Sequence, residues 1–149
     1  MRALFKLVLL CGIIVNIKTY AQTQNEESNV KVAINLLFDG MRNRDTTMIR
    51  NAFAERPIMQ TISRGEVKTE RVDDFIKSIA KPFPEKFDER ITFDKILIDA
   101  NLASVWTSYK FYIGEKFSHC GVNSFQLLKT DKGWKIIYII DTRRKDNCN

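Results

Sequence analysis

The second half of the chain consists of four segments rich in β-branched and aromatic residues, joined by very short connections. The segments are ERITFDKILID, LASVWTSYKFYI, KFSHCGVNSFQLLKT and WKIIYIIDTRR, and the connections lie at Ala100-Asn101, Gly114-Glu115 and Asp131-Lys132-Gly133. Because such short connections favour hairpins, the segments are predicted to form an antiparallel meander. A sheet of this kind needs other elements to cover one of its faces.

The first half of the chain supplies the covering elements. Residues 29–43 carry apolar side chains at helical spacing and predict a long amphipathic helix, with Val30, Ala33, Ile34, Leu37, Phe38 and Met41 on its apolar face. The further elements are a short helix between an Asp45 cap and Pro57, a hairpin turning at Arg64-Gly65, and a helix between a Thr69 cap and Pro82. This order predicts an α+β fold with three N-terminal helices packed on the sheet.

The N-terminus has the pattern of a secretory signal. Arg2 and Lys6 precede an apolar run from Leu7 to Ile17, and the small residue Ala21 follows. The run is shorter than the roughly 20 residues that span a bilayer, although an uncleaved anchor remains the alternative. We therefore expect residues 1–21 to be removed, residues 22–28 to form a disordered leader, and residues 29–149 to form one exported, periplasmic or secreted, domain.

Signal removal weakens the case for nucleic-acid binding. The signal contributes three basic residues and no acid, so the formal net charge of +6 becomes +3 in the mature chain. The densest basic cluster, Arg143-Arg144-Lys145, is flanked by Asp141 and Asp146 and is better explained as a solvated strand end. No nucleic-acid partner is expected, and no membrane association after cleavage.

The strand register follows from asking which pairing makes one face apolar. A three-residue loop at 114–116 and a pairing of Thr130 with Gly133 achieve this, whereas a two-residue loop would bring Ser108 and Lys110 onto that face. The preferred register pairs Phe111 with His119, Tyr109 with Gly121, Thr107 with Asn123, Phe125 with Tyr138, Asn123 with Ile140, and Gly121 with Thr142. It turns His119 inward and places Cys120 on the outer face.

His119 and Cys120 are neighbours in sequence but cannot form a catalytic dyad, because adjacent strand residues point to opposite faces. One histidine and two mature cysteines give no usual zinc spacing, so no metal is expected, and no cofactor. Two cysteines in an exported chain favour a disulfide, Cys120–Cys148, reached by a turn at Asp146-Asn147. His119 is then either a histidine bonded to backbone or solvent, or a polar group that lines a pocket.

The order of elements, with LASVWTSYKFYI, FSHCGVNSF and the ending GWKIIYIIDT, resembles the SnoaL-like and nuclear transport factor 2 (NTF2)-like superfamily. The resemblance covers about residues 29–145. It implies a cystatin-like cone, in which a curved antiparallel sheet wraps around the first helix. Relatives include ketosteroid isomerase, scytalone dehydratase and polyketide cyclases, as well as members that only bind, so the fold alone does not fix a function.

The resemblance and the register together define a predicted cavity. Its expected ligand-binding residues are Phe38, Met41, Met59, Thr107, Tyr109, Phe111, His119, Asn123, Phe125, Tyr138 and Thr142, a mainly apolar set with a few polar groups. Phe75 is a further candidate for its apolar wall. The catalytic candidates are His119 and Asp94, the latter pointing inward only if no bulge intervenes, while Asp141 is expected on the outer face.

Three functions compete at this point. The first is binding of a small apolar molecule without turnover. The second is isomerase, cyclase or dehydratase chemistry with His119 as acid–base, aided by Tyr109, Tyr138 or Asp94. The third is an interaction module with a closed cone. The outer sheet face carries an apolar set that favours homodimerisation through it: Trp106, Tyr112, Val122, Leu128, Ile137 and Ile139.

Overall fold

A computed structural model describes residues 24–148 of the chain. The predicted signal over 1–21 lies outside these residues. Within them, no helix has the length and apolar character that crossing a bilayer would require.

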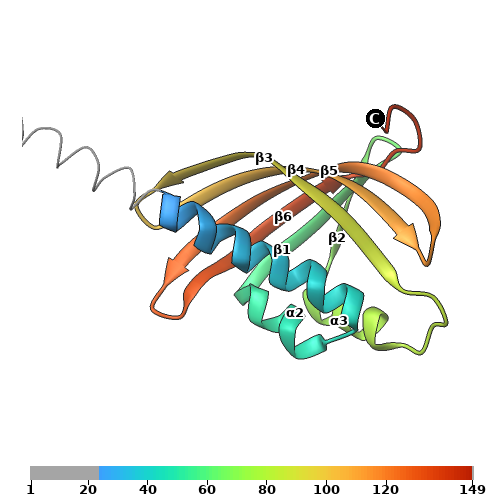
Figure 1. Cartoon of the computed structure of the whole chain (residues 1–149), viewed down its shortest axis with the longest axis horizontal. Helices are drawn as coiled ribbons and strands as arrows, with labels where there is room; N and C mark the ends of the chain where they lie inside the picture. Colours follow the sequence, from blue (N-terminus) through green and yellow to red (C-terminus); the bar gives the residue numbers. More distant parts are fainter. Residues whose placement is uncertain (1–23, 149) are drawn as a thin grey trace, which may run out of the picture.

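The described chain forms an α+β fold with one mixed sheet of six strands (Figure 1). An N-terminal helix covers residues 24–43. The other elements are α2 (Thr46–Ala52), β1 (Phe53–Ser63), β2 (Glu66–Glu70), α3 (Val72–Ala80), β3 (Phe87–Asp99), β4 (Leu102–Ile113), β5 (Lys116–Thr130) and β6 (Gly133–Thr142). The spatial order is β2-β1-β6-β5-β4-β3, so the predicted meander β3–β6 is confirmed. The β1–β2 hairpin joins this meander through a parallel pairing of β1 with β6.

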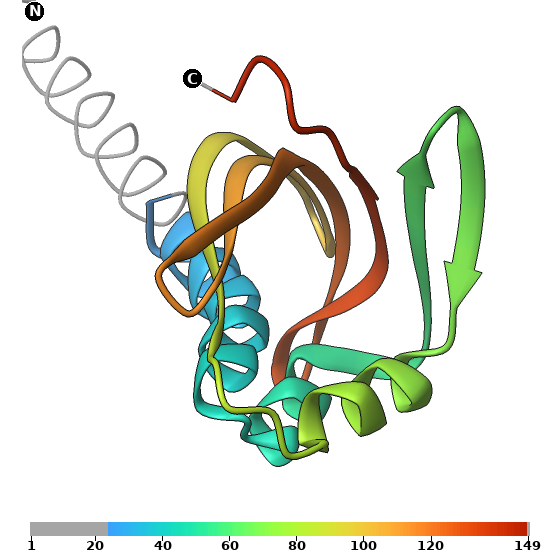
Figure 2. The same cartoon turned by 90° about the vertical axis from the view of Figure 1, so that its right-hand side faces the viewer.

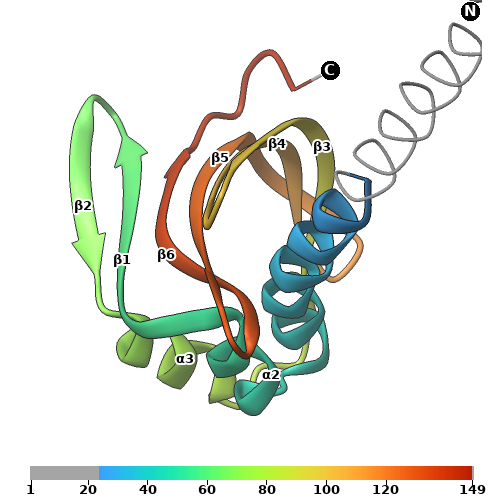
Figure 3. The same ribbon diagram turned by 90° about the vertical axis from the view of Figure 1, so that its left-hand side faces the viewer.

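The sheet curls into a cone around the N-terminal helix. Figures 2 and 3 show the concave side of β3–β6 facing this helix, with α2 and α3 at one end of the sheet and the β1–β2 hairpin standing beside β6. The buried core joins the helix to the concave face, for example through the edge-to-face contact of Phe38 with Phe125 at 6.2 Å. Val30, Ile34, Phe125, Leu127 and Ile136 are fully buried there.

The N-terminal helix starts earlier than the sequence pattern predicts. Residues 24–28 are helical. Glu26 accepts a hydrogen bond from Nε1 of Trp134 at 3.0 Å and forms an ion pair with Lys129 at 2.9 Å. The expected disordered leader is therefore wrong for residues 24–28. These polar contacts to β5 and β6 stabilise the first turn of the helix, whose residues lack the apolar spacing that would predict a helix.

The ends of the two short helices test the capping predictions. Asp45 accepts from the backbone N–H of Met48 at 2.8 Å, which confirms it as the cap of α2. Pro57 does not end α2, because Phe53 is already extended and opens β1. Thr69 does not cap α3: it lies in β2, and the cap is Arg71, which makes no side-chain capping bond. Two acids in the first turn instead complement the helix dipole.

A β-bulge in β6 reverses the facing of the strand's C-terminal half. Thr130 pairs with Gly133 as predicted, but the register shifts between Gln126 and Leu127. Phe125 consequently pairs with Ile139, and Asn123 with Asp141, so the predicted partners Tyr138 and Ile140 are wrong. The extra residue bends and twists the strand, as closure of a cone requires. Beyond it, residues 139, 141 and 143 point inward, while 138, 140 and 142 point outward.

A second bulge explains why the β4–β5 prediction succeeds at the cavity. The turn is the two-residue Gly114-Glu115 and not the predicted three-residue loop, because Ile113 pairs with Lys116. Ser118 is the extra residue that restores the expected register further along the strand. The pairings Phe111–His119, Tyr109–Gly121 and Thr107–Asn123 are therefore confirmed.

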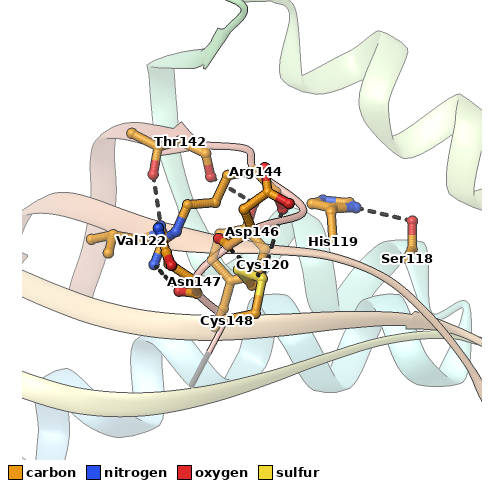
Figure 4. Close-up of a disulfide and its surroundings, with 10 residues drawn as sticks. Ser118, His119, Cys120, Val122, Thr142, Arg144, Asp146, Asn147 and Cys148 are labelled. Carbon is orange, nitrogen blue, oxygen red and sulfur yellow. Dashed lines mark hydrogen bonds between the residues drawn. A yellow bond between two sulfur atoms is a disulfide. The ribbon is translucent and has the colours of Figure 1, made fainter.

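The C-terminal tail is fastened to the outer face of β5 (Figure 4). Cys120 and Cys148 form a disulfide with their Cα atoms 5.7 Å apart, which confirms the predicted pair. Cys120 also exchanges two backbone hydrogen bonds of 2.9 Å with Arg144, and not with Arg143 as the unbulged register requires. The tail covers Cys120, which is only 2% exposed although it lies on the outer face.

Candidate functional site

The inside of the cone holds a cavity of about 250 Å³. It lies between the N-terminal helix, the β1–β2 hairpin, α3 and the concave faces of β3–β6. Its lining residues are Leu37, Phe38, Met41, Met59, Gln60, Thr61, Glu70, Phe75, Ser78, Ile79, Phe87, Glu89, Tyr109, Phe111, His119, Asn123, Ile139, Asp141 and Arg143. The volume is slightly below the usual range of drug-sized sites, roughly 300–1,000 Å³, and suits a molecule of one or two rings.

One side of the cavity is a run of stacked rings. Phe87 stacks on Phe111 with centroids 6.0 Å apart, and Phe111 lies 4.9 Å from the imidazole of His119. Phe83 extends the stack outward, 5.3 Å from Phe87. We refer to Phe87, Phe111 and His119 as the aromatic wall. It offers a flat apolar surface to a ligand.

A polar row crosses the concave face beside this wall. Thr107, Asn123, Asp141 and Thr61 are register neighbours on β4, β5, β6 and β1. Nδ2 of Asn123 donates to Oγ1 of Thr107 at 3.3 Å and to Oε1 of Glu89 at 2.9 Å. The Thr107 side chain is fully buried beneath this amide and fixes its orientation.

The other polar contacts gather around Asp141. Its Oδ2 accepts from Nε of Arg143 at 2.9 Å and from the Tyr109 hydroxyl at 3.2 Å. The same hydroxyl donates to the Thr142 carbonyl at 2.8 Å. We refer to Glu89, Asn123, Tyr109, Asp141 and Arg143 as the polar cluster. It places two carboxylates and one guanidinium at the cavity.

Glu89 is the most perturbed carboxyl group of the cluster. Burial raises its pKa to about 7, helped by the nearby negative charge of Asp141 and opposed by the Asn123 hydrogen bond. Its side chain therefore carries a proton for part of the time near neutral pH. The Tyr109 hydroxyl stays protonated, because burial and Asp141 raise its pKa.

His119 joins the aromatic wall to the polar cluster. Burial and the positive charge of Arg143 lower its pKa, which favours a neutral ring at neutral pH. Nδ1 lies 3.0 Å from the Ser118 hydroxyl, and Figure 4 shows this pair beside the tail. The ring edge packs perpendicular to Tyr109 with centroids 5.8 Å apart. A neutral imidazole held in this way can accept or donate one hydrogen bond.

The structure brings most of the predicted ligand-binding residues to the cavity. Seven of them line it: Phe38, Met41, Met59, Tyr109, Phe111, His119 and Asn123. Phe75 also does so. Thr107 and Phe125 point inward but are buried behind the lining, as supports of Asn123 and Phe38.

The remaining predicted site residues lie outside the cavity. Tyr138 bonds to Gln60 from the outer face, and Thr142 accepts from the backbone N–H of Val122 there. Both were placed inward by a register that lacked the β6 bulge. Asp94 sits at a bulge of β3, is exposed, and accepts from Ser108 at 2.6 Å, so it is not a cavity carboxylate. Ile139, expected on the outer face, is buried inside.

The sequence reasoning missed seven polar residues of the lining: Gln60, Thr61, Glu70, Ser78, Glu89, Asp141 and Arg143. Asp141 and Arg143 were predicted to face outward because the residue types in β6 do not indicate where the bulge lies. Glu89 was hidden by the bulge at Asp94, because the Ala100-Asn101 turn alone would place Arg90 opposite Phe111 and the extra residue brings Glu89 there instead. Thr61 lies in a hairpin whose pairing with β6 is parallel and therefore not implied by a local turn. Among residues 24–148, no group of three or more ligating side chains could hold a metal ion.

These features define an NTF2-like protein: a curved sheet closed around a long helix, with a small mixed cavity inside the cone. Its sequence assigns it further. The chain belongs to the family described as "Putative lumazine-binding", whose sequence profile matches residues 25–139. The matched region includes the whole aromatic wall and ends two residues before Asp141.

Solved structures share the fold at low sequence identity. An NTF2-like protein of unknown function from Shewanella baltica OS155 is 15% identical with a TM-score of 0.65, covering 82% of this chain and 96% of its own. One from Silicibacter pomeroyi DSS-3 is 13% identical with a TM-score of 0.69, covering 82% and 98%. A cystatin-like protein of unknown function from Nostoc punctiforme is 10% identical with a TM-score of 0.67, covering 80% and 92%. No curated protein gives a significant sequence match.

Proposed function

We propose that the protein binds a small, flat, mainly apolar molecule inside the cone and does not convert it. The observation that carries the proposal is the aromatic wall beside the polar cluster in a cavity of about 250 Å³. Mainly apolar linings with a few placed polar groups are typical of small-molecule sites. The lumazine-binding description of the family supports a ligand of this kind, because lumazine is a planar bicyclic heterocycle.

The direct test is titration of the purified mature protein with lumazine, followed by its own fluorescence. Phe111→Ala removes the centre of the aromatic wall and is expected to weaken binding at least about tenfold. Phe117→Ala is the matched control, because Phe117 is 39% exposed and contacts Tyr112 away from the cavity. Absence of binding, or equal losses in both variants, would contradict the proposal.

A proton-transfer enzyme is the second candidate, favoured by a cavity carboxyl group whose pKa is about 7. A general base works best when its pKa is near the working pH. In this version Glu89 replaces Asp94 as the candidate carboxyl group, and His119 lines the same cavity. Deuterium exchange next to the carbonyl of a bicyclic ketone, measured by NMR in D₂O, is expected to be catalysed by the wild type and lost in Glu89→Gln. No exchange above the buffer rate would remove this candidate.

The proposed export is supported by the Cys120–Cys148 disulfide, since such bonds persist in oxidising compartments. A homodimer through the outer sheet face is supported by Leu97, Leu102, Trp106 and Leu128, which are 42–57% exposed. Sedimentation of the wild type and of Trp106→Lys tests the dimer. A wild type that sediments as a monomer at high concentration would contradict it.

A further inference from the structure

The hydrogen-bond donors deep in the polar cluster are already used. Both N–H groups of the Asn123 amide are engaged, by Glu89 at 2.9 Å and by Thr107 at 3.3 Å. The single Tyr109 proton points to the Thr142 carbonyl and Asp141. Nε of Arg143 donates to Asp141, so only the terminal nitrogens of its guanidinium are left as donors, and this side chain is 48% exposed.

Acceptors, in contrast, remain open. Within the described part of the chain, nothing donates to Oε2 of Glu89 or to Oδ1 of Asp141, and no cation pairs with Glu89 within 4.0 Å. Oγ1 of Thr61 is buried and has no partner at all. Buried polar atoms are normally paired, so Oγ1 of Thr61, a hydroxyl that can donate or accept, marks one point where a cavity occupant can supply a hydrogen bond. The open oxygens of Glu89 and Asp141 are two further acceptors at the cavity.

The charge of the lining points the same way. Glu70, Glu89 and Asp141 contribute carboxyl groups to the cavity, and Arg143 is the one guanidinium or ammonium group among its lining residues. A carboxylate held in such a place is stabilised by N–H donors that reach both of its oxygens. An oxygen has two lone pairs, so Oε1 of Glu89 can accept from a ligand while it accepts from Asn123.

We propose that the cavity selects a planar heterocycle with two adjacent N–H donors, of the 2-aminopyrimidin-4-one type, and that Glu89 accepts from both. This inference rests on the proposed small-molecule function and specifies the hydrogen-bonding edge of the ligand. The ring stacks on the aromatic wall. Its amino group and ring N–H meet the carboxylate of Glu89.

Two pteridines that share one ring system separate this inference from its parent proposal. Pterin (2-aminopteridin-4-one) presents the paired donors, whereas lumazine presents one N–H between two carbonyl oxygens. Those carbonyl oxygens would face the Glu89 carboxylate without a proton between them. At pH 7.5 the wild type is therefore expected to bind pterin at least about tenfold more tightly than lumazine, which is the usual size of a charge-assisted hydrogen bond.

Glu89→Gln keeps the side-chain shape but presents one donor and one acceptor. The preference for pterin is expected to fall to within about twofold in this variant, because the two N–H donors of pterin then lose their charged acceptor. Asp94→Asn is the matched control, because it removes an exposed carboxylate on the outer face. It is expected to keep the full preference.

The outcomes distinguish the two proposals. Equal affinity of the wild type for both pteridines, or tighter binding of lumazine, overturns the donor-edge inference and leaves planar-ligand binding standing. A preference that survives in Glu89→Gln overturns the assignment to Glu89. Binding of neither pteridine contradicts both proposals. The two-ligand comparison on the wild type needs no variant, so it decides even if Glu89→Gln does not fold.

Discussion

Thr142 crosses over Gly121 so closely that its carbonyl oxygen occupies the space where a side chain at position 121 would begin. A Cβ there would also lie 2.7 Å from Cε1 of Tyr109. The absence of a side chain at 121 thus lets β6 approach β5 after the bulge, and it lets the Tyr109 hydroxyl reach the Thr142 carbonyl at 2.8 Å. Gly121 supports the polar cluster without touching the cavity.

Gly121→Ala is expected to destabilise the fold by about 3 kcal/mol or more, because backbone rather than a flexible side chain has to move. Gly65→Ala is the contrast: its φ is +79° but nothing lies within 4 Å, so only a backbone penalty of about 1–2 kcal/mol applies. Urea unfolding of both variants measures the difference. Equal losses would show that the close crossing is not rigid.

The raised pKa of Glu89 makes stability depend on pH. Its pKa is ordinarily 4.5 and is raised to about 7 in the fold, so the folded state binds the proton more tightly. The contribution of this group is therefore fully favourable below pH 4.5 and is lost as pH rises toward 7, by about 3 kcal/mol in total. Burial lowers the pKa of His119 from its ordinary value, so this group acts in the opposite direction and its contribution is lost as the pH falls.

The Glu89 contribution is isolated by comparing the wild type with Glu89→Gln in urea unfolding at pH 5 and pH 8. The variant is expected to gain stability relative to the wild type as the pH rises, because it has no carboxyl proton to lose. Asp94→Asn, whose carboxylate is exposed, is expected to follow the wild type. A constant difference between the wild type and Glu89→Gln at the two pH values would contradict the raised pKa.

The disulfide is expected to stabilise the fold through its loop. Cys120 and Cys148 are separated by 28 residues, which corresponds to about 3–4 kcal/mol by the chain-entropy estimate. Cys148→Ser should lower the thermal midpoint by the same amount as reduction of the wild type. Reductant should leave the variant unchanged. A wild type that is insensitive to reductant would show that the two β-bridge hydrogen bonds at Arg144 suffice.

Signal cleavage is expected after Ala21. Intact-mass measurement of the protein recovered from the exporting cell's periplasm or medium should then give a chain that begins at Gln22 and carries one disulfide. A chain that retains Met1 and Cys11 would favour the uncleaved anchor. Cleavage further into the sequence, beyond Glu26, would remove an acceptor of the Trp134 side chain and is not expected.

The parts of the fold that follow from local chemistry could be read from the sequence. Short turns fix which strands are neighbours, and alternation on β4 and β5 places Phe111, His119 and Asn123 inside. The bulge in β6 could not be read in this way, because it follows from the bend that closure of the cone demands. The one extra residue in β6 therefore turns Asp141 and Arg143 into the cavity, where the predicted register had placed Tyr138 and Thr142.

The same limit applies to elements that meet only in three dimensions. Thr61 reaches the cavity through a parallel pairing of β1 with β6, and no turn between these strands announces it. Glu26 reaches Trp134 across 108 positions of sequence. Glu89 depends on a bulge as well, since a two-residue turn with regular pairing would place Arg90 opposite Phe111, and the extra residue Asp94 brings Glu89 there instead. Its raised pKa also depends on burial that only the folded chain provides.

The bulge in β6 divides this strand into two parts with different roles. Before the bulge, Trp134 and Ile136 are buried in the hydrophobic core. After it, Asp141 and Arg143 place charged groups at the cavity. If β6 kept its sequence but paired without the bulge, Ile140 and Thr142 would face the cavity in place of Asp141 and Arg143. The pairing geometry of one strand, with no substitution, therefore decides whether an acid and a guanidinium face the interior of the cone.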